Sequence, residues 1–393
     1  MVFVGERCFI FHRILLVAMG LWPYQKPFIW RIQAVFFFST YCCTLFFQLL
    51  TFVTTACNTD CTLKRFSYFS IYFIHILSYC CFYFNSEIIK KTLEHMQFDW
   101  KLFKNSEAIN VFEEYLFEAY IVLFSAFIFV LLTAISFVTL ECRSMILDVI
   151  IPVNESRPRK IEMDFELFVD QEQYFVLYLV QEIVGMGIGA WSLLTTGTFL
   201  TTVMKHFCAT YKIASYLIRN AVTVRTLHLP IAQRIQFMFR CICLSVQIHR
   251  RTLMLCNSMI ISFNLWLSPI CGLCVLVLSC VLFRIYNAIM QFSDFYDILL
   301  CYMILFCCIM YMLLASFLAE SYTEHSIGLL ESTYNTFWYV APLPIQKLFL
   351  IMQKSIRSHK IVVGGICVAS IEGFMTFMTT AVSYFTVLHA IMS

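Results

Sequence analysis

The chain has 393 residues, of which 61% are apolar and 13% are charged, and its formal net charge is +3. A typical soluble domain carries about a quarter charged residues, so the composition indicates that lipid solvates much of the surface. The small net charge, with no basic block interleaved with aromatic residues, argues against nucleic-acid binding. The nineteen cysteines show no paired CxxC elements at metal-site spacing, so we expect buried thiols and no metal or cofactor.

Seven continuously apolar runs follow one another along the chain. Each reaches the roughly 20 residues that a helix needs to cross a hydrocarbon core of about 30 Å. Because none alternates between polar and apolar residues over ten-residue pieces, the runs predict helices and not barrel strands. We therefore predict an all-α membrane protein with seven transmembrane helices, at residues 28–57, 66–84, 116–139, 174–204, 254–283, 295–318 and 361–391.

An apolar patch at residues 14–21 precedes the first predicted span. Glu6 comes before it, and Trp22-Pro23 follows where a cleaved signal would have small residues. The patch therefore predicts an interfacial or re-entrant segment and not a secretory signal.

Lysine and arginine are divided unevenly between alternate connections. If the amino terminus is cytoplasmic, twenty of the 27 basic residues lie inside, as the positive-inside rule requires. The connection 205–251 carries most weight, because it contains eight basic residues and no acidic one. With seven spans the carboxyl terminus is then extracellular, which is opposite to a G-protein-coupled receptor.

The sequon Asn154-Glu155-Ser156 falls in the connection after the third span. The predicted orientation places this connection outside the cell, where glycans are added. Asn154 is therefore a candidate glycosylation site, and it supports the orientation independently of the basic residues.

No internal repeat divides the chain, and no linker rich in Pro, Ser or Gly interrupts it. We therefore expect a single seven-helix membrane domain over residues 1–393. The long connections 205–253 and 320–360 are expected to form an intracellular assembly region.

Short motifs recur in a distinctive order near the start, after the fourth span and over about the last seventy residues. They are Gly20-Leu21-Trp22-Pro23, His206-Phe207-Cys208, His249-Arg250-Arg251, Thr323-Glu324-His325-Ser326, Tyr334-Asn335-Thr336-Phe337-Trp338-Tyr339, Lys347-Leu348, Leu350-Ile351-Met352, Gly364-Gly365, Ser370-Ile371-Glu372-Gly373-Phe374 and Ser383-Tyr384-Phe385-Thr386-Val387-Leu388. As a set, these motifs resemble the insect odorant-receptor family.

Two positions depart from the family pattern. Ala319-Glu320 stands where many members have a Gly-polar pair, and Gly373 replaces a bulkier residue. The related gustatory receptors end with a Thr-Tyr element followed by Gln-Phe, whereas here Ser383-Tyr384 is followed by His389-Ala390. The odorant branch therefore fits better.

The resemblance implies a ligand-gated, non-selective cation channel in the plasma membrane of a sensory-neuron dendrite. It implies a heterotetramer with the family's shared co-receptor subunit, in which this chain is the odour-specific subunit. The partners it implies are the co-receptor, a small and mostly apolar odorant, the lipid bilayer and permeating cations.

The last span carries a stripe of hydroxyl-bearing and apolar residues at three- to four-residue spacing. A pore lined in this way passes a hydrated ion along hydroxyl groups and closes by dewetting at an apolar ring; the alternative is that the hydroxyls only satisfy neighbouring helices. By resemblance the gate aligns with Val387. The stripe comprises Thr376, Thr380, Ser383, Val387 and Ile391.

Glu372 lies on the same segment, about eleven residues after its predicted start. An ionisable group in an apolar run is a functional candidate. We favour an anchoring role for Glu372 over ion selection.

A volatile ligand needs an aromatic-lined cavity in the outer half of the bundle. The resemblance places this cavity among spans two, three, four and six, although aromatic stripes more often serve packing. Glu182 stands out, because a buried carboxylate accepts a hydrogen bond from a polar odorant or pairs with another helix. The candidate ligand-binding residues are Phe69, Tyr72, Phe73, Ile76, Leu132, Ile135, Ser136, Thr139, Tyr178, Glu182, Met186, Tyr302 and Phe306.

No serine–histidine–acid, metal-ligand or phosphate-loop arrangement occurs in the sequence, which argues against an enzyme. The glycines at 185, 187 and 189 follow no strand and have the wrong spacing for a dinucleotide fingerprint, so packing explains them better. The alternatives left open are a membrane transporter, which would show repeats and intramembrane charges in both halves, and a G-protein-coupled receptor, which needs the opposite orientation.

Overall fold

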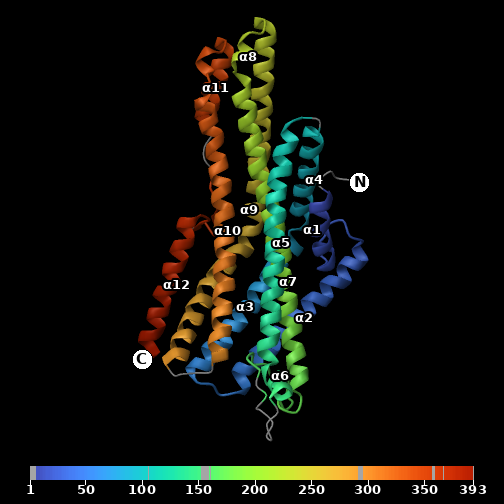
Figure 1. The fold of residues 1–393 in the computed structure, drawn as a ribbon, viewed down its shortest axis with the longest axis vertical. Helices are drawn as coiled ribbons and strands as arrows, with labels where there is room; N and C mark the ends of the chain where they lie inside the picture. Colours follow the sequence, from blue (N-terminus) through green and yellow to red (C-terminus); the bar gives the residue numbers. More distant parts are fainter. Residues whose placement is uncertain are drawn as a thin grey trace.

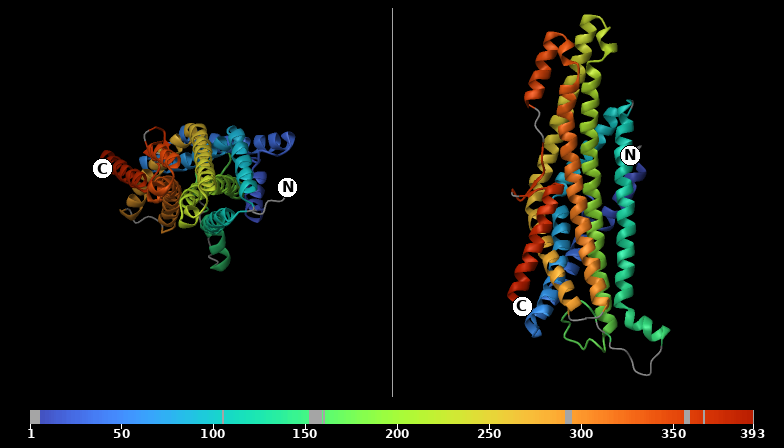
Figure 2. Two further views of the ribbon diagram at one scale, coloured as in Figure 1. Left: turned by 90° about the horizontal axis from the view of Figure 1, so that it is seen from above. Right: turned by 60° about the vertical axis from the view of Figure 1, so that its left-hand side comes forward.

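The chain forms an elongated helical bundle in which α7, α9 and α10 run side by side for most of its length (Figures 1 and 2). The computed structural model describes residues 6–104, 106–151, 159, 161–290, 295–355, 359–365 and 367–392. The elements are α1 (Glu6–Ala18), α2 (Pro27–Thr54), α3 (Thr59–Phe84), α4 (Ser86–Phe103), α5 (Ala108–Glu141), α6 (Arg143–Ile150), α7 (Phe175–Ala221), α8 (Val224–Leu227), α9 (Ile231–Met290), α10 (Phe295–Asn335), the 3₁₀ helix η1 (Trp338–Val340), α11 (Leu343–Ser355), β1 (Val362–Val363), β2 (Cys367–Val368) and α12 (Ile371–Met392).

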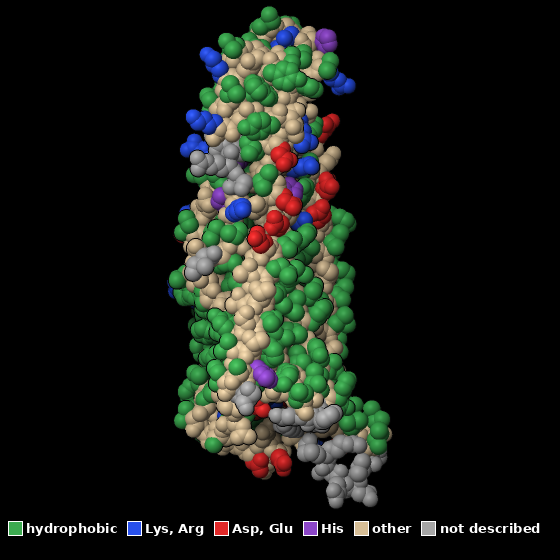
Figure 3. All heavy atoms as spheres, turned by 90° about the vertical axis from the view of Figure 1, so that its left-hand side faces the viewer, with side chains coloured by type: hydrophobic (Ala, Val, Ile, Leu, Met, Phe, Trp, Pro, Cys, Tyr) green, Lys and Arg blue, Asp and Glu red, His purple; other side chains and the backbone are tan. Residues whose placement is uncertain are grey.

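Seven helices of the described chain are long and apolar enough to cross a membrane, which confirms the predicted number of spans. They are α2, α3, α5, α7, α9, α10 and α12. On the face drawn in Figure 3, apolar side chains cover the lower half, while charged side chains gather above this belt and at the lower tip. The chain is a multi-pass membrane protein.

Three of the spans extend far beyond a bilayer. Helices α7, α9 and α10 contain 47, 60 and 41 residues. At 1.5 Å per residue α9 is about 90 Å long, or about three times the thickness of a hydrocarbon core. Most of the connections predicted at 205–253 and 320–360 are therefore helical extensions, which rise to α8 and α11 at one end of the bundle (Figure 1).

The last span begins ten residues later than the predicted 361–391. Gly364 and Gly365 have φ angles of 66° and 72°, in the left-handed region that glycine adopts without steric cost. They turn the chain between the antiparallel strands β1 and β2. Glu372 consequently lies in the first turn of α12 and is exposed, not placed partway along an apolar span as expected.

A buried polar network joins α4 to α7 and α9 in the half of the bundle that carries α8. Asp99 of α4 lies 3.1 Å from Nε2 of His206 and also accepts from the guanidinium of Arg251. His206 stacks on Phe112 of α5, with ring centroids 4.9 Å apart. The network fixes α4 against the long helices, because its charges are paired and hydrogen-bonded where burial would otherwise be costly.

Candidate functional site

A buried aromatic cluster lies between α3, α5 and α7 in the half of the bundle that ends at α6. Tyr68 and Tyr72 come from α3, Phe137 from α5, and Phe175 and Tyr178 from α7. An enclosed apolar site with a few placed polar groups is the usual form of a small-molecule site. This aromatic cluster is the candidate ligand site.

Two glycines of α7 allow α3 to approach closely at the cluster. A Cβ atom at Gly185 would lie 2.7 Å from the hydroxyl of Tyr72, and one at Gly189 would lie 2.0 Å from Nδ1 of His75. The Tyr72 and His75 rings meet edge-on with centroids 5.9 Å apart. The glycines at 185 and 189 are therefore a packing motif that seats both rings against the backbone of α7.

Glu182 lies on α7 one helical turn before Gly185 and is fully buried. Among the residues that the structure describes, neither carboxyl oxygen of Glu182 has a partner with good hydrogen-bond geometry, although the backbone N–H of Met163 is near enough to interact with the group. The Tyr72 hydroxyl and Nδ1 of His75 also have no partner among these residues. Buried polar groups without partners are rare in proteins. Glu182, Tyr72 and His75 together form a row of unused hydrogen-bonding groups, which a ligand's polar atoms would stabilise.

The segment 161–167, just before α7, covers the cluster. Its odd-numbered residues Ile161, Met163 and Phe165 are buried in the aromatic cluster. The alternation places the acidic residues between them on the other side, as in an extended chain. The segment therefore covers the site, with its apolar side chains packed against the cluster and its acidic side chains directed away from it.

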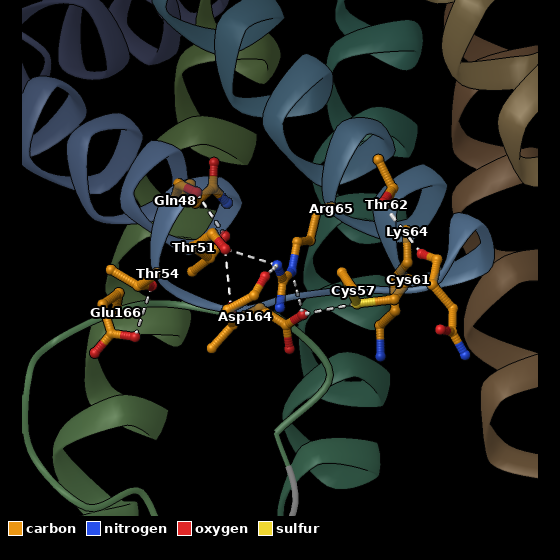
Figure 4. A network of polar contacts seen from close by, with 12 residues as sticks. Gln48, Thr51, Thr54, Cys57, Cys61, Thr62, Lys64, Arg65, Asp164 and Glu166 are labelled. Atoms are coloured by element: carbon orange, nitrogen blue, oxygen red, sulfur yellow. Dashed lines mark hydrogen bonds and ion pairs between the residues drawn. A yellow bond between two sulfur atoms is a disulfide. The ribbon is translucent and has the colours of Figure 1, made fainter.

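Those acidic side chains fasten the segment to α2 and α3 (Figure 4). Asp164 lies 2.9 Å from Nε of Arg65, and Glu166 accepts from the hydroxyl of Thr54 at 3.0 Å. Glu162, which is itself buried, lies 2.5 Å from Nζ of Lys64. Because Lys64 and Arg65 are adjacent, one turn of α3 holds the covering segment in register.

Four of the predicted ligand-binding residues come together in this cluster. Tyr72, Tyr178 and Met186 pack within it, and Glu182 lies on the same stretch of α7. The hydroxyl of Tyr178 donates to the backbone oxygen of Val169 at 3.0 Å. Tyr178 thus ties the covering segment to α7 as well.

The other predicted ligand-binding residues are not brought into the aromatic cluster. Phe69 stacks on the exposed Phe73, and Ile76 packs in a different core cluster. The predicted face of α5 points away from the bundle, and the predicted face of α10 is also exposed. The exposed residues on these two helices are Leu132, Ile135, Ser136, Thr139, Tyr302 and Phe306.

Comparison of the structure with solved structures finds full-length matches. The insect olfactory receptor OR5 from Machilis hrabei in complex with eugenol superposes with a TM-score of 0.78, covering 98% of this chain and 99% of that one at 12% sequence identity. The OR5 structure without a named ligand gives 0.73 at the same identity, with 98% of both chains covered. This chain has the insect olfactory receptor fold. No protein-family profile and no curated protein sequence matches it.

Within this olfactory receptor fold, α12 packs by one face only. Phe374 and Ala381 are buried against α9 and α10, and Ser279 of α9 donates to the backbone oxygen of Ala381 at 3.0 Å. The stripe predicted to line a pore lies mostly on the exposed side, with Val387 53% and Ile391 76% exposed. Thr376 and Ser383 are also exposed, and Thr380 is half-buried.

Two features of the connections at the α6 end bear on the sequence predictions. Cys57, in the connection after α2, forms a disulfide with Cys61 in the first turn of α3, so these two cysteines are not the buried thiols that were expected. Asn154, the candidate glycosylation site, lies outside the residues that the structure describes. No group of three or more His, Cys, Asp or Glu side chains within the described ranges is placed to hold a metal ion.

The covering segment and its basic partners were missed by sequence reasoning. The signal was present, because Ile161-Glu162-Met163-Asp164-Phe165-Glu166-Leu167 alternates strictly between apolar and acidic residues. Such a period of two indicates an extended segment with one buried face. On α5, Phe137 and Leu140 face the cluster in place of the predicted residues.

Proposed function

We propose that this chain is an odour-specific subunit of the insect odorant-receptor family. It binds a small organic ligand in the aromatic cluster and opens a cation channel together with a co-receptor subunit. The full-length match to the olfactory receptor fold carries the proposal. The motifs near both ends of the chain support it independently, because a fold alone does not establish a function.

The ligand that best fits the site donates a hydrogen bond. Glu182 supplies two unused acceptor oxygens, and the Tyr72 hydroxyl supplies one group that either donates or accepts. The walls are aromatic and apolar. A small alcohol, phenol or amine with an apolar body satisfies both requirements, and the OR5 complex with eugenol supports a ligand-binding role for this fold.

The proposed orientation places the α6 end outside the cell. The disulfide between Cys57 and Cys61 supports this, since disulfides persist in oxidising compartments. The basic connection 205–251 then lies in the cytoplasm, as the positive-inside rule predicts. The plasma membrane is the proposed location.

The proposed channel is a heterotetramer in which α12 of each subunit lines a central pore. An exposed hydroxyl-bearing stripe ending at Val387 and Ile391 supports this role. The helical extensions of α7, α9 and α10, with α11, are the proposed assembly region, since they leave the membrane belt and offer long surfaces to neighbouring subunits.

The test is expression in oocytes with and without the co-receptor, with current recorded during application of an odorant panel. We expect ligand-dependent cation current only when both subunits are present, and we expect it to persist under G-protein blockade. Current abolished by the blockade would establish the metabotropic alternative. Ligand uptake without channel current would establish the transporter alternative.

Glu182→Gln tests the ligand class. A hydrogen bond of this kind contributes about 0.5–1.5 kcal/mol, so the concentration of alcohol or amine for half-maximal current should rise several-fold, up to about tenfold. Responses to ligands of the same shape without a donor should change little. Glu172→Gln removes an exposed carboxylate from the same region and is the matched control. Equal shifts for both kinds of ligand would contradict the assignment to Glu182.

A further inference from the structure

A groove of about 630 Å³ opens between the end of α3, α4 and the middle of α9. It lies in the half of the bundle that carries α8, away from the aromatic cluster. The proposed ligand site and pore do not involve it. Its lining residues are Phe84, Asn85, Glu87, Ile88, Lys91, His95, Gln247, Arg250, Arg251, Met254, Leu255, Ser258 and Ser262.

The upper wall of the groove is basic. Lys91, Arg250 and Arg251 carry three positive charges against the single carboxylate of Glu87. Arg251 is already held by Asp99, and its guanidinium lies 4.7 Å from the ring centre of Phe98. These contacts hold the guanidinium of Arg251 at the edge of the groove, and they neutralise the carboxylate of Asp99.

The other two cations are available to a ligand. Lys91 and Arg250 are exposed, and neither forms an ion pair with any residue in the part of the chain that the structure describes. The Ser262 hydroxyl and the Gln247 amide add donors at the groove. The Ser258 hydroxyl already donates to the backbone oxygen of Met254 at 2.9 Å, and the Asn85 amide donates one N–H to that of Cys81 at 2.8 Å and keeps the second. Two basic side chains without an acidic partner, with neutral donors beside them, are suited to bind a phosphate group.

The lower wall is apolar and continues along the membrane-facing surface of α9. Phe84 stacks on Trp266, with ring centroids 5.5 Å apart and planes 3° from parallel. Met254, Ile261 and Leu265 lie on one face of α9, because they are seven and four residues apart, or about two turns and one turn of a helix, and each is at least 60% exposed. An apolar track thus leads from the basic groove into the part of α9 that crosses the membrane.

We infer that the groove binds the headgroup phosphate of an anionic phospholipid, whose acyl chains lie along Ile261 and Leu265. The apolar track that adjoins the basic wall favours a lipid over a soluble phosphate compound. A soluble ligand would use the basic wall alone, whereas the exposed apolar track below it fits a hydrocarbon chain. Under the proposed orientation the lipid belongs to the cytoplasmic leaflet.

The test uses full-length protein in detergent and measures binding of dioctanoyl phosphatidic acid by native mass spectrometry. Dioctanoyl phosphatidylcholine is the control lipid. We expect the double variant Lys91→Gln/Arg250→Gln to weaken phosphatidic acid binding roughly tenfold or more, since basic residues at a lipid surface each contribute to attraction of anionic headgroups. Arg240→Gln alters an exposed arginine on the same helix but outside the groove and should leave binding unchanged.

A second pair of measurements separates the lipid from a soluble phosphate. Ile261→Ser/Leu265→Ser should weaken phosphatidic acid binding and leave glycerol 3-phosphate binding unchanged. Glycerol 3-phosphate that binds as tightly as the lipid would overturn the lipid assignment. Equal binding by wild type and by Lys91→Gln/Arg250→Gln, or an equal loss in Arg240→Gln, would overturn the groove as the site. Each variant changes exposed side chains, and its elution on size exclusion reports folding.

Discussion

Gly189 of α7 lies directly against the imidazole of His75 on α3, so close that a Cβ atom at position 189 would come within 2.0 Å of Nδ1. The same Cβ atom would lie 2.6 Å from Cγ of the imidazole, and His75 is only 4% exposed, so the ring has little room to move away. The spacing between α3 and α7, and with it the position of Tyr72, depends on this glycine.

Gly189→Ala should therefore destabilise the protein and disturb the ligand site. Overpacking a filled core costs about 1–3 kcal/mol. We expect a lower midpoint of thermal unfolding in detergent and a weaker response to every ligand. Gly187→Ala is the matched control, since a Cβ atom there meets nothing within 4 Å. An unaltered midpoint in Gly189→Ala would show that α3 and α7 separate without cost.

The two ion pairs that fasten the covering segment should differ in strength. The Glu162 side chain is 3% exposed, while that of Asp164 is 35% exposed. Removing one partner of a buried pair costs up to about 3–5 kcal/mol, reduced here because Nη2 of Arg143 lies 3.7 Å from Oε1 of Glu162, whereas a more exposed pair contributes about 1 kcal/mol or less. We expect Lys64→Met to raise hydrogen exchange across 161–167 much more than Asp164→Asn does. The reverse order would mean that Arg65 holds the segment.

Some residues of the candidate ligand site were predictable from the sequence, because a polar side chain stands out within a long apolar run. Glu182 and Tyr72 were identified in that way. The face of α5 was not predictable, because lipid and protein interior are equally apolar and a lipid-exposed helix carries Leu and Ile on all sides. Only three-dimensional packing distinguishes the inward Phe137 from the outward Ile135.

The spans themselves were predictable, because each must satisfy its backbone hydrogen bonds internally over about 20 apolar residues. Their ends were not. The run of apolar residues continues through β1 and β2, and only the glycine pair at 364–365 marks the turn that delays α12. The extensions of α9 and α10 contain polar residues, so the apolar run ends where the helix continues, and the sequence pattern did not predict one continuous helix.

The stripe on α12 predicts which positions a water-soluble thiol reagent reaches in the open channel. Cysteine substituted at Val387 should react and reduce the current, because the side chain points away from α9 and α10. Cysteine substituted at Ala381, which is fully buried, should not react. The unsubstituted chain, which carries native cysteines, provides the baseline. Equal modification at both positions would contradict a pore on the exposed face of α12.

His359 joins α9 to α10 just before the hairpin that leads to α12. Its Nε2 lies 2.7 Å from Oδ1 of Asn257 and its Nδ1 lies 3.0 Å from the hydroxyl of Tyr322. Because the Asn257 oxygen only accepts, Nε2–H donates to it and Nδ1 accepts from Tyr322. The neutral imidazole fits this arrangement, and protonation of Nδ1 would reverse its bond to Tyr322, whose hydroxyl would then have to accept.

Burial lowers the pKa of His359 below its ordinary value of 6.5. Well above pH 6.5 the folded and unfolded states both carry neutral imidazole, so the group adds little pH dependence there. As pH falls below 6.5, the unfolded state binds the proton first, and the free energy of unfolding falls. The midpoint of thermal unfolding should therefore drop between pH 7 and about pH 5.5.

The chain has nine histidines, so the contribution of His359 is the difference between wild type and His359→Gln. Glutamine keeps one donor and one acceptor but does not titrate. We expect the variant to lose part of the decrease in melting midpoint on acidification, with a smaller change at neutral pH. Parallel pH profiles for the two proteins would show that protonation of His359 does not loosen the contact between α9 and α10.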